Sequence, residues 1–218
     1  MGGTAGAMGT LAALIYFMYS VDLQQKELQA QRRDIRDTKL NQKIHQFEVT
    51  YFNYLHLLQG VIGSFKHGEE IGACCFECFA GVLEADLKMK KSEKVDENAV
   101  CDFFRKREED LCYYFSNVNQ VLALLKFASD FVKDKVMLGS YYALLEAQLT
   151  QSAKELLYLY ARHYDGRVFG VEVLSNDFVL AMEQVINSLL SGNEKERVDA
   201  LKGLKGKSVF SLDYGSKS

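Results

Sequence analysis

The stretch LNQKIHQFEVTYFNYLHLL, residues 40–58, decides the fold of this 218-residue chain. Its apolar side chains recur at spacings of four, three, four, three and four residues: Leu40, Ile44, Phe47, Tyr51, Tyr54 and Leu58. This spacing places them on one face of a helix, and that face must pack against other elements. Glycines follow at positions 60, 63 and 68 and predict the end of the helix.

The chain on the C-terminal side of this stretch carries similar patterns and predicts an all-α fold. Proline, the residue that most often ends helices, is absent from the sequence. We expect further helices over residues 69–89, 100–132, 135–149, 152–164 and 177–190, of which the second can break near Arg107. In the helix over residues 100–132, six apolar residues are expected to face inward: Leu111, Phe115, Val118, Val121, Leu122 and Leu125.

Local signals predict where several of these helices begin and end. Ser152 and Glu155 have the spacing of a capping box, in which each side chain satisfies a free backbone N–H at a helix start. Asn176 is a candidate N-cap, and Asp165-Gly166 predicts a helix end. The segment from Ser191 is rich in Lys and Gly and is expected to be only partly ordered. The predicted organisation is a transmembrane helix (1–21), a helical stalk (22–39), a helical bundle (40–190) and a tail (191–218).

The first 21 residues, MGGTAGAMGTLAALIYFMYSV, contain no charged side chain. A helix of 21 residues is about 31 Å long, close to the thickness of a hydrocarbon core of about 30 Å. A cleaved signal peptide would carry basic residues before its apolar run, and no Lys or Arg precedes Leu11. We therefore interpret the segment as a retained transmembrane helix, with a buried helix of a water-soluble domain as the alternative.

The residues after this segment predict its orientation and the nature of the stalk. Five basic residues follow within about 20 positions, which places the rest of the chain in the cytoplasm: Lys26, Arg32, Arg33, Arg36 and Lys39. Val21, Leu28 and Ile35 repeat every seven residues, but Gln24, Gln31 and Thr38 occupy the intervening apolar positions of a heptad. The stalk therefore has only a weak coiled-coil seam.

Charge and cysteine content exclude some functions. The net charge is −3, and residues 47–193 hold 14 basic and 21 acidic side chains, so no nucleic-acid partner is predicted. Five cysteines, an odd number, argue against a secreted disulfide framework. The sequence CCFEC (residues 74–78) has no second ligand pair, so core thiols are favoured over a metal site or a redox sensor.

Motifs for catalysis are missing from the sequence. Gly206-Lys207-Ser208 imitates a P-loop end, but Leu201 stands where the motif needs glycine. There is no nucleophile elbow, HExxH or dinucleotide fingerprint. Arg162 and His163 are adjacent, which does not fit the Arg–His spacing of helical HEPN-type RNases. We predict no catalytic, cofactor-binding or metal-binding residue and no cofactor, and a structural role is favoured for His56.

Three segments carry a resemblance to a known family: FEVTYFNYLHLLQGVIGSF (47–65), YFSNVNQVLALLKFASD (114–130) and YYALLEAQLTQSAKELLYLYARHY (141–164). With the Gly-rich apolar leader and the Gln/Lys/Arg stalk, they resemble the bacterial phage abortive infection proteins of the AbiC-like family over about residues 1–165. Glu146 departs from the pattern, where that family has a basic residue. The family has no agreed chemistry, so the resemblance implies only candidates of unknown role: His56, Gln148 and Glu155.

The favoured hypothesis is a single-pass protein of the inner (cytoplasmic) membrane that takes part in bacterial anti-phage defence. It would act through protein or membrane interaction as a sensor, adaptor or effector, and its partners would be the lipid bilayer and either a second copy or another defence protein. An enzyme is less favoured. One alternative is a helical nuclease or nucleotide-acting toxin with a site built from His56, Glu146, Gln148 and Glu155. The other is a passive oligomeric membrane scaffold.

Overall fold

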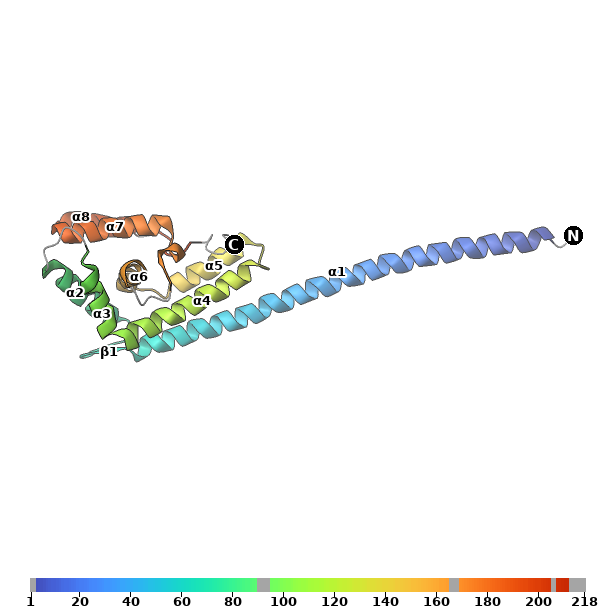
Figure 1. Ribbon diagram of the computed structural model, residues 1–218. Helices are drawn as coiled ribbons and strands as arrows, with labels where there is room; N and C mark the ends of the chain where they lie inside the picture. Colours follow the sequence, from blue (N-terminus) through green and yellow to red (C-terminus); the bar gives the residue numbers. More distant parts are fainter. Residues whose placement is uncertain (1–2, 90–94, 165–168, 205–206, 212–218) are drawn as a thin grey trace. The chain divides into compact units, whose positions relative to one another are not determined.

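The computed structural model describes residues 3–89, 95–164, 169–204 and 207–211, with backbone only for residues 3–13, 15, 89 and 110. This described part is mostly helical, as the sequence predicts (Figure 1). Its α-helices are α1 (Gly3–Ser64), α2 (Cys74–Met89), α3 (Glu97–Lys106), α4 (Tyr113–Ser129), α5 (Lys135–Glu146), α6 (Gln151–His163), α7 (Asn176–Ser191) and α8 (Glu194–Leu204). The chain divides into two compact units, Met1–Gln46 and Phe47–Ser218.

The first unit consists of α1 up to Gln46, and its described side chains are almost all exposed. Lys26 and Asp22, four residues apart, form an ion pair of 2.7 Å along its surface. Within the described residues, no helix has a stretch that is both long enough and apolar enough to span a membrane. The predicted transmembrane segment, residues 1–21, falls largely outside the described side chains, which begin at Leu14.

The second unit begins where the apolar face of α1 becomes buried. Phe47, Tyr51, Leu55 and Leu58 are at most 7 % exposed, whereas Leu40 is 38 % exposed. The predicted inward face is therefore correct at Phe47, Tyr51 and Leu58 and wrong at Leu40. Ile44 and Tyr54 are only half-buried, and Leu55, which the predicted face did not include, is buried. Periodicity alone does not decide which of these positions are buried, because burial needs a neighbouring element to pack against.

A short hairpin follows α1, where the sequence predicts a helix from residue 69. Strands β1 (Lys66–His67) and β2 (Glu70–Ile71) pair antiparallel. Gly68 and Gly72 adopt positive φ angles of 64° and 76°, which favour glycine and interrupt a right-handed helix. The predicted start of the helix is wrong, since α2 begins only at Cys74, and Ile71 lies in β2 with its side chain 59 % exposed.

The remaining helices surround α6, which contacts α2, α3 and α7. The predicted helix over residues 100–132 is divided near Arg107, where a π-helical segment (Glu108–Cys112) separates α3 from α4. The six residues expected to face inward, Leu111 in the π-helical segment and Phe115, Val118, Val121, Leu122 and Leu125 in α4, are all at most 1 % exposed. Tyr160 of α6 lies against the rings of Phe104, Phe115, Tyr164 and Phe169, with centroids 4.7–5.7 Å apart.

Short polar side chains begin most of these helices, but two predicted caps are wrong. Thr150 Oγ1 accepts a hydrogen bond from the Ala153 N–H at 3.1 Å, so α6 is capped by Thr150 and there is no capping box at Ser152. Ser175 Oγ accepts from the Phe178 N–H at 3.2 Å, so Ser175 and not Asn176 caps α7. Residues 165–166, the predicted end of the helix, lie outside the described residues, and α6 ends at His163.

In the tail that the sequence predicts to be only partly ordered, residues Glu194–Leu204 form α8, and Leu204, Val209 and Phe210 are buried. Phe210 forms a β-bridge with Leu174, which lies next to the 3-10 turn Val171–Val173. The tail is mostly polar, but it contains a few apolar residues that pack against the bundle. Residues 212–218 lie outside the described part.

Two buried tyrosines differ in whether the hydroxyl is hydrogen-bonded, so removing each hydroxyl is expected to change stability in opposite directions. The Tyr51 hydroxyl donates to the Tyr141 carbonyl at 2.5 Å, whereas the buried Tyr114 hydroxyl has no hydrogen-bond partner among the described residues. We expect Tyr51→Phe to lower the free energy of unfolding by about 1 kcal/mol and Tyr114→Phe to raise it by a similar amount. Urea unfolding of both variants measures the two changes. Destabilisation by Tyr114→Phe would show that its hydroxyl is satisfied.

Candidate functional site

The three family-matched residues do not form one site. His56 is exposed on α1. Gln148 accepts a hydrogen bond from the amide of Gln59 at 2.8 Å, which connects α1 to the loop after α5. Glu155 lies on α6, where it accepts from the Gln151 amide at 3.2 Å. No hydrogen bond or ion pair among the described residues joins any two of the three.

Glu146, the fourth residue of the enzyme hypothesis, lies in a different place from Glu155. Its carboxylate accepts hydrogen bonds from the Ser208 hydroxyl at 3.2 Å and the Val209 N–H at 3.1 Å, and Lys154 lies 3.4 Å away. It borders an open hollow of about 420 Å³ over α5. These contacts attach the segment after α8 to α5, so the position of Glu146 has a structural explanation.

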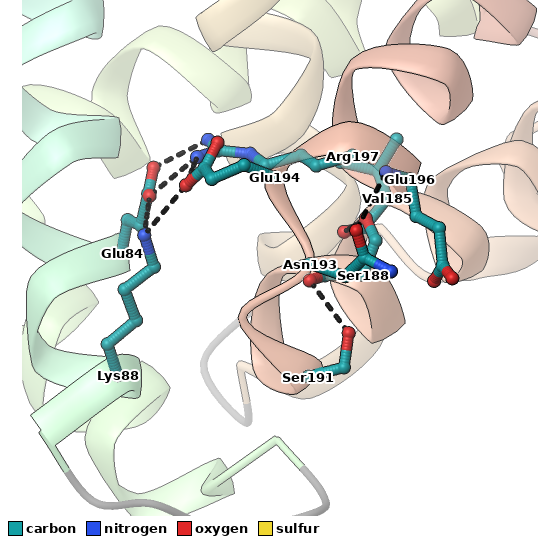
Figure 2. A network of polar contacts seen from close by, with 9 residues as sticks. All are labelled: Glu84, Lys88, Val185, Ser188, Ser191, Asn193, Glu194, Glu196 and Arg197. Carbon is teal, nitrogen blue, oxygen red and sulfur yellow. Dashed lines mark hydrogen bonds and ion pairs between the residues drawn. The ribbon is translucent and has the colours of Figure 1, made fainter.

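The strongest polar arrangement in the described residues joins α2 to α8 (Figure 2). Glu84 of α2 accepts hydrogen bonds from both terminal nitrogens of Arg197, each at 2.6 Å, and from Lys88 at 2.7 Å. Glu194 lies farther out, 3.6 Å from Lys88 and 3.9 Å from Arg197. The bidentate geometry makes Arg197–Glu84 the strongest of these pairs. We call Glu84, Lys88, Glu194 and Arg197 the ion-pair network.

The turn between α7 and α8 places Arg197 against α2. Gly192 has a positive φ of 71°, its N–H donates to the Leu189 carbonyl, and the Asn193 N–H donates to the Ser188 carbonyl at 3.2 Å. This is the hydrogen-bond pattern of a Schellman helix end. Asn193 Oδ1 then accepts from the Glu196 N–H at 3.2 Å and caps α8. The signal Gly192-Asn193 was present in the sequence and, read as an end and a start, would have predicted α8.

Glu155 lies beside the ion-pair network. Both Glu155 and Arg197 line a hollow of about 20 Å³ between α2, α6, α7 and α8, which has room for one water molecule. Burial raises the pKa of Glu155, partly opposed by the Gln151 hydrogen bond and by the charge of Arg197. Burial acts in the same direction on Glu84, but hydrogen bonds from Lys88 and Arg197 outweigh it and lower the pKa of Glu84. A space of this size does not admit an organic substrate.

The raised pKa of Glu155 predicts a pH-dependent effect of its substitution. Because folding favours the neutral carboxyl, the contribution of Glu155 to stability is fully present below the pKa of an unfolded glutamate and is lost as the pH rises through the raised native pKa. We expect Glu155→Gln to raise the midpoint of thermal unfolding at pH 7 and to have no such effect near pH 4. Glu109→Gln, at an exposed position, is the control. A loss of stability at pH 7 would show that Glu155 acts as a counter-ion of Arg197.

A second open cleft, of about 300 Å³, lies where α3, α6 and α7 meet. Arg162 lies 3.7 Å from Glu183, and His163 Nδ1 lies 3.7 Å from Glu97, whose side chain is 76 % exposed. Burial raises the pKa of Tyr158, another lining residue, to about 12, so its hydroxyl stays protonated. The adjacent positions of Arg162 and His163 in the sequence exclude the spacing of a HEPN-type pair, and no local pattern predicts that they share a cleft with two glutamates. Arg162 is paired with Glu183 and His163 lies against Glu97, an arrangement that does not resemble an activated nucleophile and its base.

The cysteines of CCFEC lie in three different environments. Cys75 is buried, Cys78 is half-buried and Cys74 is exposed. The Cys75 thiol donates to the Glu70 carbonyl at 3.4 Å, and burial raises the pKa of this thiol, which makes it a poor nucleophile. The core-thiol interpretation is therefore correct for Cys75 and wrong for Cys74. Among the described residues, no group of His, Cys, Asp and Glu has the arrangement of a metal site.

Comparison with family models, with curated proteins and with solved structures found no significant match for this chain. The resemblance to the abortive infection proteins therefore stays a prediction from the quoted segments.

Proposed function

We propose that this chain is a membrane-tethered helical protein of bacterial anti-phage defence that acts by binding other proteins. The proposed membrane tether rests on one observation. Five large apolar side chains near the start of α1 are between 57 % and 75 % exposed: Leu14, Tyr16, Phe17, Met18 and Tyr19. Removing such side chains from water stabilises by roughly 1.5 kcal/mol or more each when burial is complete, so an apolar environment that covers them is strongly favoured.

The distribution of these side chains around the helix supports lipid as that environment. Successive helical residues are about 100° apart, so five side chains within six positions point to all sides of α1. A protein groove covers one stripe of a helix, whereas lipid surrounds it. Tyr16 and Tyr19 are of the type that gathers at membrane interfaces, and the first charged residue, Asp22, follows directly. The basic residues of the stalk follow, which supports a cytoplasmic location for the second unit.

The role in defence rests on the resemblance of the three quoted segments. A role through binding is supported by the second unit, where the charged groups in each hollow are paired with one another (Arg162 with Glu183, Lys154 with Glu146) and the network residues hold α8. Such pairing supports a stable binding module, which the tether would hold near the membrane.

A charged substitution within the exposed apolar run tests the tether. A charge costs about 3 kcal/mol at the centre of a membrane helix and less toward an interface, so Phe17→Asp, near the cytoplasmic end of the segment, is expected to lower the membrane-to-soluble ratio about tenfold in cell fractionation. Gln25→Asp, at an exposed polar position, is the matched control and is expected to stay in the membrane fraction. Recovery of the unaltered chain in the soluble fraction would overturn the tether.

Phage challenge tests the role in defence. Cells that carry the intact gene are expected to survive as a culture and to lose individual infected cells, whereas cells that carry Phe17→Asp are expected to lyse like cells without the gene. Scoring membrane integrity together with survival distinguishes a membrane effector from a sensor. Equal plaque numbers with and without the intact gene, over a panel of phages, would overturn the proposal.

A further inference from the structure

The stalk part of α1 carries an exposed apolar stripe that repeats every seven residues. Leu14, Val21, Leu28 and Ile35 are spaced at sevens, and Leu28 and Ile35 are 54 % and 55 % exposed. In heptad notation they are the a positions, where β-branched residues such as Val21 and Ile35 favour two-stranded coiled coils. The d positions hold Gln24, Gln31 and Thr38, which weaken such a pair and restrict its register.

The charges that flank this stripe favour a second copy of the same helix as the partner, in parallel orientation. With these a positions, the g positions hold Glu27 and Asp34, and the e positions hold Arg32 and Lys39. In a parallel pair in register, each g residue faces the e residue five positions later on the other helix. Glu27 then meets Arg32 of the second copy and Asp34 meets Lys39, so all four contacts join opposite charges.

An antiparallel pair of the same helices would bring g residues to g residues and e residues to e residues. Glu27 and Asp34 would then face acidic groups, and Arg32 and Lys39 would face basic ones, which is repulsive. Within one chain, none of the four forms an ion pair with any described residue, whereas Asp22 and Lys26, at outer positions, pair with each other. The e and g charges are therefore available to a second helix.

The stripe stays exposed beyond the stalk. In the second unit, Val49 and Phe52 continue the a and d positions and are 48 % and 50 % exposed. The core residues Phe47 and Tyr51 occupy the f and c positions, on the opposite side of the helix. Packing of the bundle thus uses one face of α1 and leaves the stripe uncovered.

We propose that two copies of this chain pair through α1 as a parallel, in-register coiled coil over residues 21–39, with Glu27–Arg32 and Asp34–Lys39 contacts between copies. The pairing does not require the membrane tether. It is compatible with it, because two copies held by the same leader in one bilayer have parallel helices.

Cysteine crosslinking of the full-length chain in a mild detergent tests this geometry. In a background in which the exposed Cys74 is changed to Ser, Leu28→Cys and Ile35→Cys are each expected to form a disulfide with the same residue of a second copy. Arg33→Cys, at the outer f position, is the matched control and is expected to stay monomeric. Crosslinking at only one of the two positions, equal crosslinking at 33, or none at all would overturn the proposal, and so would a link between residues 28 and 35 in an equimolar mixture of the two variants. Mass spectrometry of the linked peptides identifies which cysteines reacted.

Charge reversal distinguishes a specific coiled coil from crosslinking by random encounters between copies. Glu27→Lys with Asp34→Lys makes every charged e and g position basic, and Arg32→Glu with Lys39→Glu makes every one acidic. Each variant alone is expected to associate at least tenfold more weakly than the unaltered chain in sedimentation equilibrium, and an equimolar mixture is expected to recover association. Asp22→Lys with Asp37→Lys changes the net charge equally at outer positions and is expected to have no effect. Similar weakening by this control would overturn the proposed contacts, while membrane recovery of all variants is expected to be unchanged.

Discussion

Tyr160→Ala is expected to destabilise the second unit more than any other single substitution considered for this protein. The side chain is fully buried on α6, and its ring contacts four other aromatic rings that come from α3, α4 and the segments after α6. Truncation leaves a cavity that close-packed neighbours fill only in part. We expect a loss of about 3–5 kcal/mol in the free energy of unfolding.

Thermal unfolding measures this loss, with an expected decrease of about 10 °C in the midpoint for a unit of this size. Phe127→Ala is the matched control, because this aromatic residue of α4 is 60 % exposed. It is expected to change the free energy of unfolding by less than about 1 kcal/mol. Comparable losses for the two variants would show that α6 is not at the centre of the core.

Arg197→Ala is expected to cause the second-largest loss in the free energy of unfolding, and the loss is expected to be local to α8. The guanidinium donates twice to Glu84, and the side chains of Arg197 and Glu84 are only 20 % and 23 % exposed. Without Arg197, the largely buried Glu84 carboxylate keeps Lys88 but loses two charge-assisted hydrogen bonds. We expect a loss of about 2–3 kcal/mol, less than for a fully buried pair because water reaches the network in part.

Amide hydrogen exchange shows which helices lose stability in this variant. Amides of α8 are expected to exchange faster in Arg197→Ala, whereas those of α4 are expected to change little, since the network joins α8 to α2. Lys202→Ala, on the same helix with a 67 % exposed side chain, is the control. Equal exchange of α8 in both variants would show that the turn at Gly192, and not Arg197, holds the helix.

The same pair also predicts a dependence on pH. Because the network lowers the pKa of Glu84, its contribution is present above the pKa of an unfolded glutamate and is lost as the pH falls through the native value. The difference in stability between Arg197→Ala and the unaltered chain is therefore expected to shrink under acid conditions. A double-mutant cycle with Glu84→Gln isolates the pairwise free energy.

The sequence alone determined the helical class, the approximate ranges of α4 and α5, the break near Arg107 and the core face of α1 from Phe47. These features depend on local periodicity and backbone preference, which are visible within about one or two dozen residues. The charges beside the seven-residue repeat, Glu27, Arg32, Asp34 and Lys39, are likewise a property of the sequence, since a helix fixes their relative positions.

Only the tertiary structure decided that Glu155 lies beside Arg197, that Glu146 binds the segment at Val209, and that Arg162 and His163 share a cleft with Glu97 and Glu183. Glu84 and Arg197 are 113 positions apart in the chain, and no local pattern states which distant helix a charged residue will meet. The position of a cap was equally undetermined, because Thr150 and Ser152 can both bond a free N–H and the packing of α6 selects one. Local preferences define helices, whereas contacts between elements are selected by how their side chains fill a common core.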